Sequence, residues 1–418
     1  RRAWQPMVWY MDMAPHSQRH APRPGGRPNI LIAMIEAGGG HKAAAAALEA
    51  QFTLAYPDQF EVRTLDFMAA VGEVALDRRH KRTWSWLLRH PKVAYLAQRA
   101  IDGAVPPMLT NLAQDVLLRR FSRRASAFVN EHRIDLVIAV HFMPLRALAA
   151  AAARGDHDAA LVGVDTELFD GNALWAERRM DELMVATEPC RAGLEARGVP
   201  ADRLSVIGYP LHPKYLQVDK DARSMRARLG MGQDRFTVVH VAGGEGIGGA
   251  LEGTARAVAG SDDSIQYVAI CGDNVPLRRR LQELALQVPP GVLRVEGFVD
   301  NLHEYLVASD VVVGKAGPGV TMETMAVGRP IVHTSFASAS ERANIDFCTR
   351  HQIGMFLTDP AAIVAALRAL DRDRERLSAL QHRAAALAPE VGTASIVNRV
   401  AERLGVTSQG SPTVAGST

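Results

Sequence analysis

Short apolar runs alternate with longer stretches rich in Ala, Leu and Arg along most of the chain. Such runs are typical of buried parallel strands, and the stretches between them have the composition of helices that cover a sheet. The pattern occurs twice, which predicts an α/β protein with two doubly wound domains. The expected strands are 30–36, 61–66, 136–140, 161–164, 183–186 and 205–207 in the first half, and 237–241, 266–271, 293–296, 311–313 and 330–333 in the second.

The alternation stops at both ends of the chain. Residues 1–27 are rich in Pro, Arg and Gly and lack the apolar core of a signal peptide, and residues 408–418 are of low complexity, so we expect disorder in both. A polar stretch with proline near 212–222 predicts the boundary between the domains. We therefore expect a first domain over 28–215, a second over 216–390 and a final segment over 391–407.

Composition agrees with two globular domains. The 418 residues are too many for one ordinary core, and 48% apolar with 22% charged residues excludes disordered, collagen-like and coiled-coil classes. The net charge of +3 gives no argument for nucleic acid, and we find no motif that binds it. Three distant cysteines without a CxxC pair predict neither disulfides nor a zinc cluster, which fits a reducing cytoplasm. No apolar run reaches the roughly 18 residues of a membrane-spanning helix.

One segment, 78–99, combines seven basic residues with tryptophan and contains no acidic residue. Cations beside indoles at helical spacing are typical of a helix at a membrane surface, where cations meet anionic headgroups. An ordinary solvated helix that packs one face on the sheet would show the same charges. The candidate membrane residues are Arg78, Arg79, Lys81, Arg82, Trp84, Trp86, Arg89 and Lys92.

A glycine-rich turn follows the first strand. Gly38, Gly39 and Gly40 lead into His41 and a helix. Free amides at such a helix start favour an anion or a sugar oxygen, and the spacing differs from the dinucleotide fingerprint. His41 is a candidate general base, with a structural cap as the alternative role.

The second expected domain contains two glycine turns, 242–249 and 315–321, each between a strand and a helix. Both turns offer amides suited to phosphate. Glu323 follows the second turn closely enough to accept hydrogen bonds from a vicinal diol. Together the two turns predict a ligand that carries a diphosphate.

With these motifs in this order, the chain resembles glycosyltransferase family 28 over about residues 28–400. Within that family it resembles the diacylglycerol glycosyltransferases, which are the monogalactosyldiacylglycerol synthases and the processive diacylglycerol glucosyltransferases. The resemblance implies the GT-B fold, in which two Rossmann-like domains face a cleft and the C-terminal helix packs back onto the first domain. The matching pieces are Gly38-Gly39-Gly40-His41, His141, Gly208-Tyr209-Pro210, the run from Gly243 to Gly248, the run from Gly297 to Asn301, the run from Lys315 to Gly319 with Glu323, and Glu341 with Asn344.

The resemblance also implies that the second domain binds a UDP-sugar. The uracil would lie against the backbone of Phe298 and Val299, the ribose against Glu323, and the sugar against Glu341 and Asn344. Preorganised amides stabilise a leaving diphosphate without a metal, so we expect no metal and no other cofactor. Helix capping is the structural alternative for Glu323 and Glu341. The residues implied at the diphosphate are Gly243, Gly244, Gly246, Gly317, Pro318, Gly319, Val320 and Thr321.

On the first domain, the resemblance implies an acceptor site with His41 as the base. The acceptor residues would be Gly39, Gly40, His141 and Trp175. Three positions depart from the family pattern. The stretch Thr166-Glu167 stands for the usual Thr-Asp, Asn172 for the usual His before Trp, and Ser340 for the Gln that commonly precedes the sugar-binding Glu.

The implied function is an inverting transfer of a hexose from a UDP-sugar to a lipid, first of all diacylglycerol. The enzyme would lie on the anionic inner face of the cell membrane, from the cytoplasmic side. Two alternatives stay open: the same chemistry on a polyprenyl-linked or soluble acceptor, and a non-catalytic UDP-sugar-binding protein, to which Asn172 and Ser340 point. A UDP-sugar epimerase shares the architecture, but His141 and the glycine–histidine turn follow the transferases.

Overall fold

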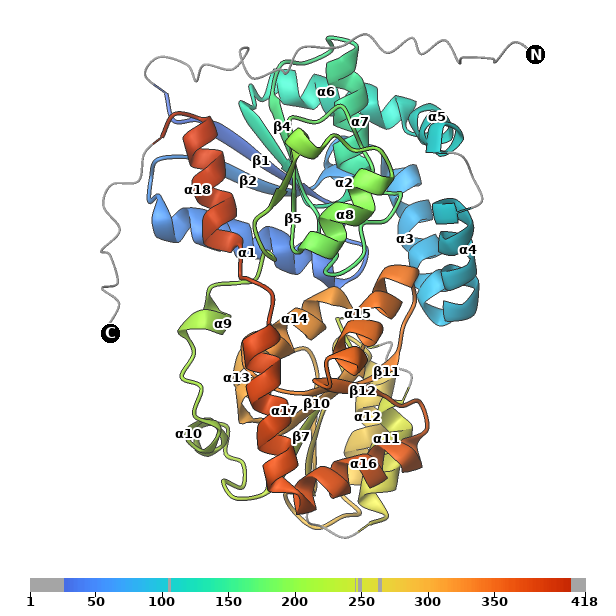
Figure 1. Ribbon diagram of the computed structural model, residues 1–418, viewed down its shortest axis with the longest axis vertical. Coiled ribbons are helices and arrows are strands. Elements are labelled where there is room, and N and C mark those ends of the chain that lie inside the picture. Colours follow the sequence, from blue (N-terminus) through green and yellow to red (C-terminus); the bar gives the residue numbers. More distant parts are fainter. Residues whose placement is uncertain (1–25, 104–106, 245, 247–249, 262–264, 407–418) are drawn as a thin grey trace, which may run out of the picture.

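The computed structural model describes residues 26–103, 107–244, 246, 250–261 and 265–406, and these form two α/β domains, one above the other in Figure 1. The expected tail 408–418 lies outside the described residues, as does all of the expected arm except residues 26 and 27. Within the described ranges each domain has one six-stranded parallel sheet covered by helices, so the predicted fold class is confirmed.

The first sheet has the strand order β2-β1-β3-β4-β5-β6. Its strands are β1 (Asn29–Met34), β2 (Glu61–Asp66), β3 (Leu136–Ala139), β4 (Ala160–Val164), β5 (Glu182–Val185) and β6 (Leu204–Val206). The second sheet has the order β12-β11-β10-β7-β8-β9. Its strands are β7 (Phe236–Val241), β8 (Ile265–Ile270), β9 (Leu293–Glu296), β10 (Val311–Lys315), β11 (Ile331–Ser335) and β12 (Gly354–Phe356).

Helices cover both faces of each sheet and fill the connections. Those of the first domain are α1 (Gly39–Ala55), α2 (Phe67–Ala70), α3 (Val74–Arg89), α4 (Pro91–Gly103), α5 (Pro107–Leu117), α6 (Arg119–Glu131), α7 (Phe142–Ala153), α8 (Glu188–Ala196) and the short 3₁₀ helix η2 (Ala201–Arg203). Those that follow are α9 (Lys214–Gln217), α10 (Ala222–Arg228), α11 (Leu251–Ala259), α12 (Val275–Ala285), α13 (Leu302–Ala308), α14 (Pro318–Ala326), α15 (Ala339–Arg350), α16 (Pro360–Arg372), α17 (Arg374–Leu387) and α18 (Thr393–Arg403).

Alternation along the central strands builds a core on each side of each sheet. In β1, Leu31 and Ala33 face one cluster, while Ile30 and Ile32 face the other. Helix α18 returns from the second domain and packs against α1, where Ile396 joins the second of these clusters. Figure 1 shows this helix, in red, beside the blue α1.

Each sheet has one place where neighbouring strands send their connections to opposite sides. In the first sheet this switch point lies between β1 and β3, and in the second between β7 and β10. Ligands of open α/β sheets bind outside the carboxyl ends of the strands at such a point. The glycine turns after β1, β7 and β10 therefore lie where the topology favours a ligand.

Candidate functional site

The turn after β1 places His41 at the switch point of the first sheet. Gly38 has φ of +80°, a conformation that favours glycine, and α1 begins at the next residue. A Cβ atom added to Gly39 or Gly40 would meet nothing within 4 Å. The start of α1 is therefore open to a ligand, with His41 in its first turn.

Two oxygen atoms of the neighbouring strand ends hold the His41 ring. Its Nδ1 lies 2.9 Å from the carbonyl oxygen of Val140 and 3.1 Å from Oγ1 of Thr166. Because a carbonyl only accepts, Nδ1 carries the proton and Nε2 keeps the free lone pair. Burial lowers the pKa of His41 to about 4, so the ring is neutral at neutral pH, as a general base must be.

Two further histidines pack around His41. The His141 ring lies 4.6 Å from that of His41, and the His80 ring from α3 lies 5.4 Å from that of His141. His141 is 2% exposed, and its Nδ1 accepts a hydrogen bond from the amide of Met143 at 3.1 Å, which caps α7. Burial lowers the pKa of His141 well below its usual value. His141 thus packs against the His41 ring and caps α7, and its contact with the acceptor stays a prediction.

Helix α3 turns two of its predicted membrane residues inward. Lys81 forms ion pairs with Asp66 and Asp77. Trp84 packs on the core of the first domain, and its Nε1 lies 3.2 Å from the position of a Cβ added to Gly38. Lys81 and Trp84 are therefore half-buried on the side of α3 that faces the first domain. The other candidates are exposed, namely Arg78, Arg79, Arg82, Trp86, Arg89 and Lys92.

The inner face of α3 also carries polar atoms without partners. Within the described residues, Nε2 of His80 and Nε1 of Trp84 are buried and make no hydrogen bond. These two residues are four positions apart, so they share one side of the helix. Sequence reasoning missed His80 because it stands among the arginines and lysines of the basic segment.

Trp175 does not reach the cleft. It is 1% exposed and belongs to the core of the first domain, with the ring of Phe142 at 6.5 Å. The predicted contact between Trp175 and the acceptor is therefore wrong, because the indole packs on the apolar side of the sheet.

Acidic residues follow β4 at the domain interface. Burial raises the pKa of Asp165 to about 7 and that of Glu167 well above its usual range. Asp165 accepts hydrogen bonds from the amide of Glu167 at 2.9 Å and from Sγ of Cys190 at 3.3 Å. The charges of Glu341 and Lys315 from the second domain act on Glu167. Asp165, which the sequence analysis did not select, neighbours the threonine that holds His41.

The turn after β7 is open at two of its predicted glycines. A Cβ added to Gly243 or Gly244 would meet nothing within 4 Å. A Cβ on Gly246 would lie 2.3 Å from the Cβ of Asn274, whose Nδ2 donates to the Gly246 carbonyl at 2.9 Å. Gly246 is therefore needed for packing against the next turn, and its amide donates to the Gly243 carbonyl at 3.0 Å; its contact with the diphosphate stays a prediction. Residues 245 and 247–249 of this turn lie outside the described residues.

The turn after β10 offers fewer amides than the sequence suggested. Gly317 is the N-cap of α14, and Pro318 has no N–H. The amide of Thr321 bonds to the Gly317 carbonyl at 3.1 Å, and its Oγ1 lies 3.2 Å from Nε2 of His333. Thr321 is thus fully engaged inside the protein, which corrects its assignment to the donor. Gly319 and Val320 keep first-turn amides that the helix itself cannot satisfy.

The candidates for uracil and ribose lie around α9. Phe298 is 64% exposed, and Nζ of Lys214 donates to the carbonyl of the nearby Asp300 at 2.8 Å. The charge of Lys214 also acts on Glu323, whose carboxylate accepts a hydrogen bond from Tyr215. Burial raises the pKa of Glu323. The structure therefore brings Glu323 near the segment of Phe298 and Val299.

Glu341 lies beside the α14 turn. Its Oε1 accepts a hydrogen bond from Nζ of Lys315 at 2.5 Å, and its Oε2 accepts one from the amide of Ala337 at 2.5 Å. Asn344 is completely buried, and its Nδ2 donates to the Ala316 carbonyl at 2.9 Å. Asn344 therefore fixes the turn through Nδ2, while its buried Oδ1 makes no hydrogen bond among the described residues, and its contact with the sugar stays a prediction. Lys315 adds a positive charge that the sequence analysis had treated only as part of a motif.

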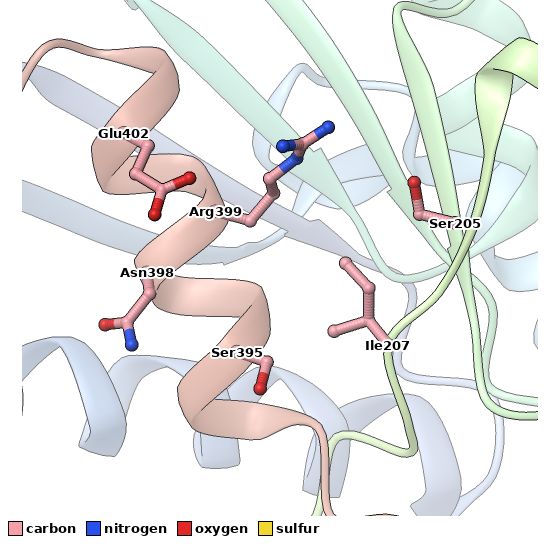
Figure 2. Close-up of a pocket in the computed structure, with 6 residues that line it drawn as sticks. All are labelled: Ser205, Ile207, Ser395, Asn398, Arg399 and Glu402. Carbon is pink, nitrogen blue, oxygen red and sulfur yellow. The ribbon is translucent and has the colours of Figure 1, made fainter.

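A surface hollow of about 430 Å³ lies away from both switch points, between β6 and α18 (Figure 2). None of the predicted site residues lines it. Among the described residues, no group of three or more His, Cys, Asp and Glu side chains could hold a metal ion. No helix in the described part of the chain is long and apolar enough to cross a membrane.

Comparisons with known proteins agree with this arrangement. Residues 41–211 match the family model "Monogalactosyldiacylglycerol (MGDG) synthase", and residues 250–373 match "Glycosyl transferases group 1". A probable monogalactosyldiacylglycerol synthase 2, chloroplastic, from Oryza sativa subsp. japonica is 28% identical over 79% of this chain and 71% of the rice protein. Monogalactosyldiacylglycerol synthase 1, chloroplastic, from Arabidopsis thaliana is 25% identical over 80% of this chain and 63% of the relative.

Solved structures share the fold. HepE of Anabaena in complex with UDP superposes with a TM-score of 0.54 at 16% identity, covering 90% of this chain and 99% of HepE. MurG of Acinetobacter baumannii gives 0.55 at 12% identity, again over 90% and 99%. The MnaA–UDP structure from S. aureus gives 0.56 at 14% identity, over 93% and 100%. The chain therefore has the GT-B fold of these solved structures, and its residues 41–211 match the monogalactosyldiacylglycerol synthase family model.

Proposed function

We propose that the protein is an inverting glycosyltransferase that moves a hexose from a UDP-sugar to diacylglycerol. The observation that carries the proposal is the neutral imidazole of His41 at one switch point, on a helix that contacts α14 at the other. Relatives named for monogalactosyldiacylglycerol synthesis support this acceptor. Neighbours solved with UDP support this donor.

In this mechanism, Nε2 of His41 takes the proton of the acceptor hydroxyl as its oxygen attacks the anomeric carbon. The attack comes from the face opposite the diphosphate, so the configuration inverts. The positive charge that forms on the ring is stabilised by the hydrogen bond from Nδ1 to the Val140 carbonyl. Gly39, Gly40 and the indole of Trp84 would border the acceptor.

The second domain would hold the donor. Phe298 and Val299 would hold the uracil and Glu323 the ribose. The amides of Gly319 and Val320, with the open turn at Gly243 and Gly244, would stabilise the charge that grows on the leaving diphosphate. Lys315 would turn from Glu341 to the diphosphate, which frees Glu341 for the sugar hydroxyls. We expect transfer without a metal, so activity should survive excess EDTA.

We propose that the outer face of α3 and α4 binds an anionic membrane surface on the cytoplasmic side of the cell membrane. Trp86 is 48% exposed and Leu96 is 65% exposed, and cations surround them. Apolar side chains among cations are suited to the boundary between headgroups and acyl chains. Such a face would bring the cleft to a lipid acceptor. The cations of this face are Arg78, Arg79, Arg82, Arg89 and Lys92.

The test is release of UDP from UDP-galactose, UDP-glucose and UDP-N-acetylglucosamine, with and without vesicles that contain diacylglycerol, followed by mass spectrometry of the lipids. We expect release that depends on diacylglycerol and a lipid that gains a hexose. His41→Ala should abolish transfer, whereas the control His90→Ala, at an exposed histidine, should not.

Other outcomes would replace the proposal. A hexose found on a polyprenyl-linked or soluble acceptor, but never on diacylglycerol, would change the acceptor. Binding of UDP without turnover on any acceptor would indicate a non-catalytic protein.

A further inference from the structure

The hydroxyl of Ser340 in the second domain uses all of its hydrogen-bonding capacity on residues of the first domain. Its Oγ accepts hydrogen bonds from Nδ2 of Asn172 at 3.1 Å and from Nε2 of Gln98 at 3.0 Å, and it donates to Oδ2 of Asp170 at 3.2 Å. A serine hydroxyl has one donor and two acceptor sites, so every site is used. Ser340 is 1% exposed, and all three partners come from the other domain. We call these four residues the Ser340 contact.

Gln98 on α4 also holds the backbone at the start of α15. Its Oε1 accepts a hydrogen bond from the amide of Ala339, the first residue of that helix, at 2.8 Å. The side chain thus satisfies one of the amides that a helix start leaves free. Figure 1 shows α15 reaching up toward α4 across the two domains.

Ring contacts flank the Ser340 contact on both sides. The rings of Tyr95 on α4 and Phe336 before α15 lie 5.7 Å apart, edge to face. Phe169 after β4 stacks on Phe347 of α15 at 3.8 Å. The polar contact therefore has apolar ring contacts beside it, and the buried hydroxyl of Ser340 would lose free energy with any missing partner.

The residue after Ser340 is Glu341. Its two carboxylate oxygens hold Lys315 and the amide of Ala337, and Oε1 lies 3.9 Å from a Cβ placed on Gly317. A shift of the first turn of α15 therefore moves Glu341 relative to the α14 turn. Ser340 and Gln98 hold the first turn of α15 through their hydrogen bonds.

Helix α4 has an opposite, exposed face. The exposed residues on this face recur at helical spacing, and they are Lys92, Val93, Leu96 and Arg99. Gln98 lies on the inner face with Tyr95. One short helix thus carries a face suited to lipid and a face that fixes the start of α15.

We propose that Ser340 and Gln98 are positioning residues for the donor sugar, and that through them docking of α4 on a lipid surface strengthens binding of the UDP-sugar. The inference rests on the proposed function for the identity of the donor. The pair Asn172 and Ser340 departs from the family pattern at both positions, and the two residues bind each other. Asn172 and Ser340, the two residues that differ from the family pattern, together form a contact between the domains.

The experiment is calorimetric titration of UDP and of UDP-galactose into the full chain, with and without vesicles of phosphatidylglycerol and phosphatidylcholine that lack diacylglycerol. For the unmodified protein, we expect vesicles to tighten UDP-galactose binding about fivefold or more, in the range of ordinary coupling between sites. Binding of UDP alone should change little, because UDP lacks the sugar that Glu341 would hold.

Three variants test the residues. Gln98→Ala and Ser340→Ala should weaken UDP-galactose binding and remove the effect of vesicles, with UDP binding retained. Ser340→Thr keeps the hydroxyl and should restore much of the effect. Gln98→Ala is a mild change at a partly exposed helical position, and alanine favours helix, so this variant should fold. Matched controls are Gln282→Ala and Ser395→Ala, at exposed positions on α12 and α18.

Each contrary outcome is distinct. Equal loss of UDP and UDP-galactose binding, with a lowered melting temperature, would show a merely structural contact. A vesicle effect that persists in Gln98→Ala, or that never appears, would overturn the link to the membrane. A protein that binds UDP-galactose but transfers nothing to diacylglycerol would overturn the acceptor and leave this inference standing. A protein that binds no UDP-sugar would overturn both.

Discussion

His41 combines a half-buried, desolvated ring with a free proton-accepting atom, and this sets the pH at which it works. Burial lowers its pKa from 6.5 to about 4, so the ring gains a proton only as the pH falls toward that value. A base must be unprotonated to act. We therefore expect kcat/KM to stay level down to about pH 5 and to decline below it, without the decline near 6.5 of an ordinary histidine.

The pH profile needs a check on folding. Between pH 6.5 and about 4 the native state binds fewer protons at His41 than the unfolded chain does, so the contribution of this ring to stability falls as the pH falls. Melting temperatures across the same range separate lost activity from lost structure. A decline of kcat/KM centred near 6.5 in folded protein would contradict the role of the desolvated ring.

Trp84 and Trp86 stand two positions apart and face opposite environments. The N–H of Trp84 is buried against the glycine turn, whereas Trp86 is exposed and stacks on His90 at 4.3 Å. Trp84→Phe removes the N–H and keeps a ring. We expect a KM for diacylglycerol raised about fivefold, because the unpaired N–H would donate a hydrogen bond of about 1 kcal/mol to the acceptor. Trp86→Phe should leave this KM unchanged and weaken vesicle binding.

The measurement uses a short-chain diacylglycerol in solution for KM and pelleting of vesicles for binding. The KM for the UDP-sugar serves as the control in both variants. If the two variants exchanged these effects, our assignment of the faces of α3 would be wrong.

Single residues were the hardest feature to predict from sequence. The sequence places Thr321 and Asn344 near the donor turn, but their side chains bond inward, to partners 12 and 28 residues away along the chain. Trp175 likewise stands near the acceptor loop and points into the core. Position along the chain fixes which turn a residue occupies, whereas its direction depends on distant partners that no local pattern contains.

Elements were predicted well because buried parallel strands are nearly continuous apolar runs. Every expected strand is present, with its ends shifted by at most two residues. The strand that sequence reasoning missed, β12, has three residues, and all of them are only half-buried at the edge of the sheet. Such a short edge strand has no apolar run to reveal it.

The segment that leaves the first domain at Gly208 packs tightly against the segment that returns to it at Glu390, and this packing depends on Gly208. Gly208 has φ of +103°, and a Cβ there would lie 2.5 Å from the carbonyl oxygen of Glu390. The next residue, Tyr209, bonds to that same carbonyl and to the amide of Gly392. We expect Gly208→Ala to destabilise the protein by about 1–3 kcal/mol, because strain and overlap act together.

Urea unfolding measures this loss. The matched control is Gly230→Ala, whose φ is +67° but whose Cβ would meet nothing within 4 Å. The difference between the two variants isolates the overlap at Gly208. Equal losses would show that the backbone conformation alone accounts for the effect.

At the scale of the whole molecule, the two switch points are brought together, because α1 at one of them contacts α14 at the other. The sequence analysis located both, since each has a glycine turn between a strand and a helix. It could not show that α1 contacts α14 or that α4 binds the start of α15, because both contacts join segments more than 200 residues apart. The active arrangement thus arises from the packing of the domains.

The exposed cations on the outer face of α3 and α4 should make binding to anionic membranes depend on salt. Replacing Arg82, Arg89 and Lys92 by Gln should weaken binding to anionic vesicles, by about 1 kcal/mol for each cation near the surface. Salt screens exposed charges over about 10 Å at 0.1 M, so the unmodified protein should lose affinity as salt rises and approach the variant. Sedimentation with vesicles at several salt concentrations measures both effects.

The matched control neutralises three exposed arginines of the second domain, Arg223, Arg256 and Arg279, which are 66%, 55% and 81% exposed. This variant has the same net charge as the first, so it separates a local basic face from overall attraction. We expect it to bind vesicles nearly as the unmodified protein does. Equal weakening of the two variants would mean that overall charge, and not α3 and α4, brings the cleft to the lipid.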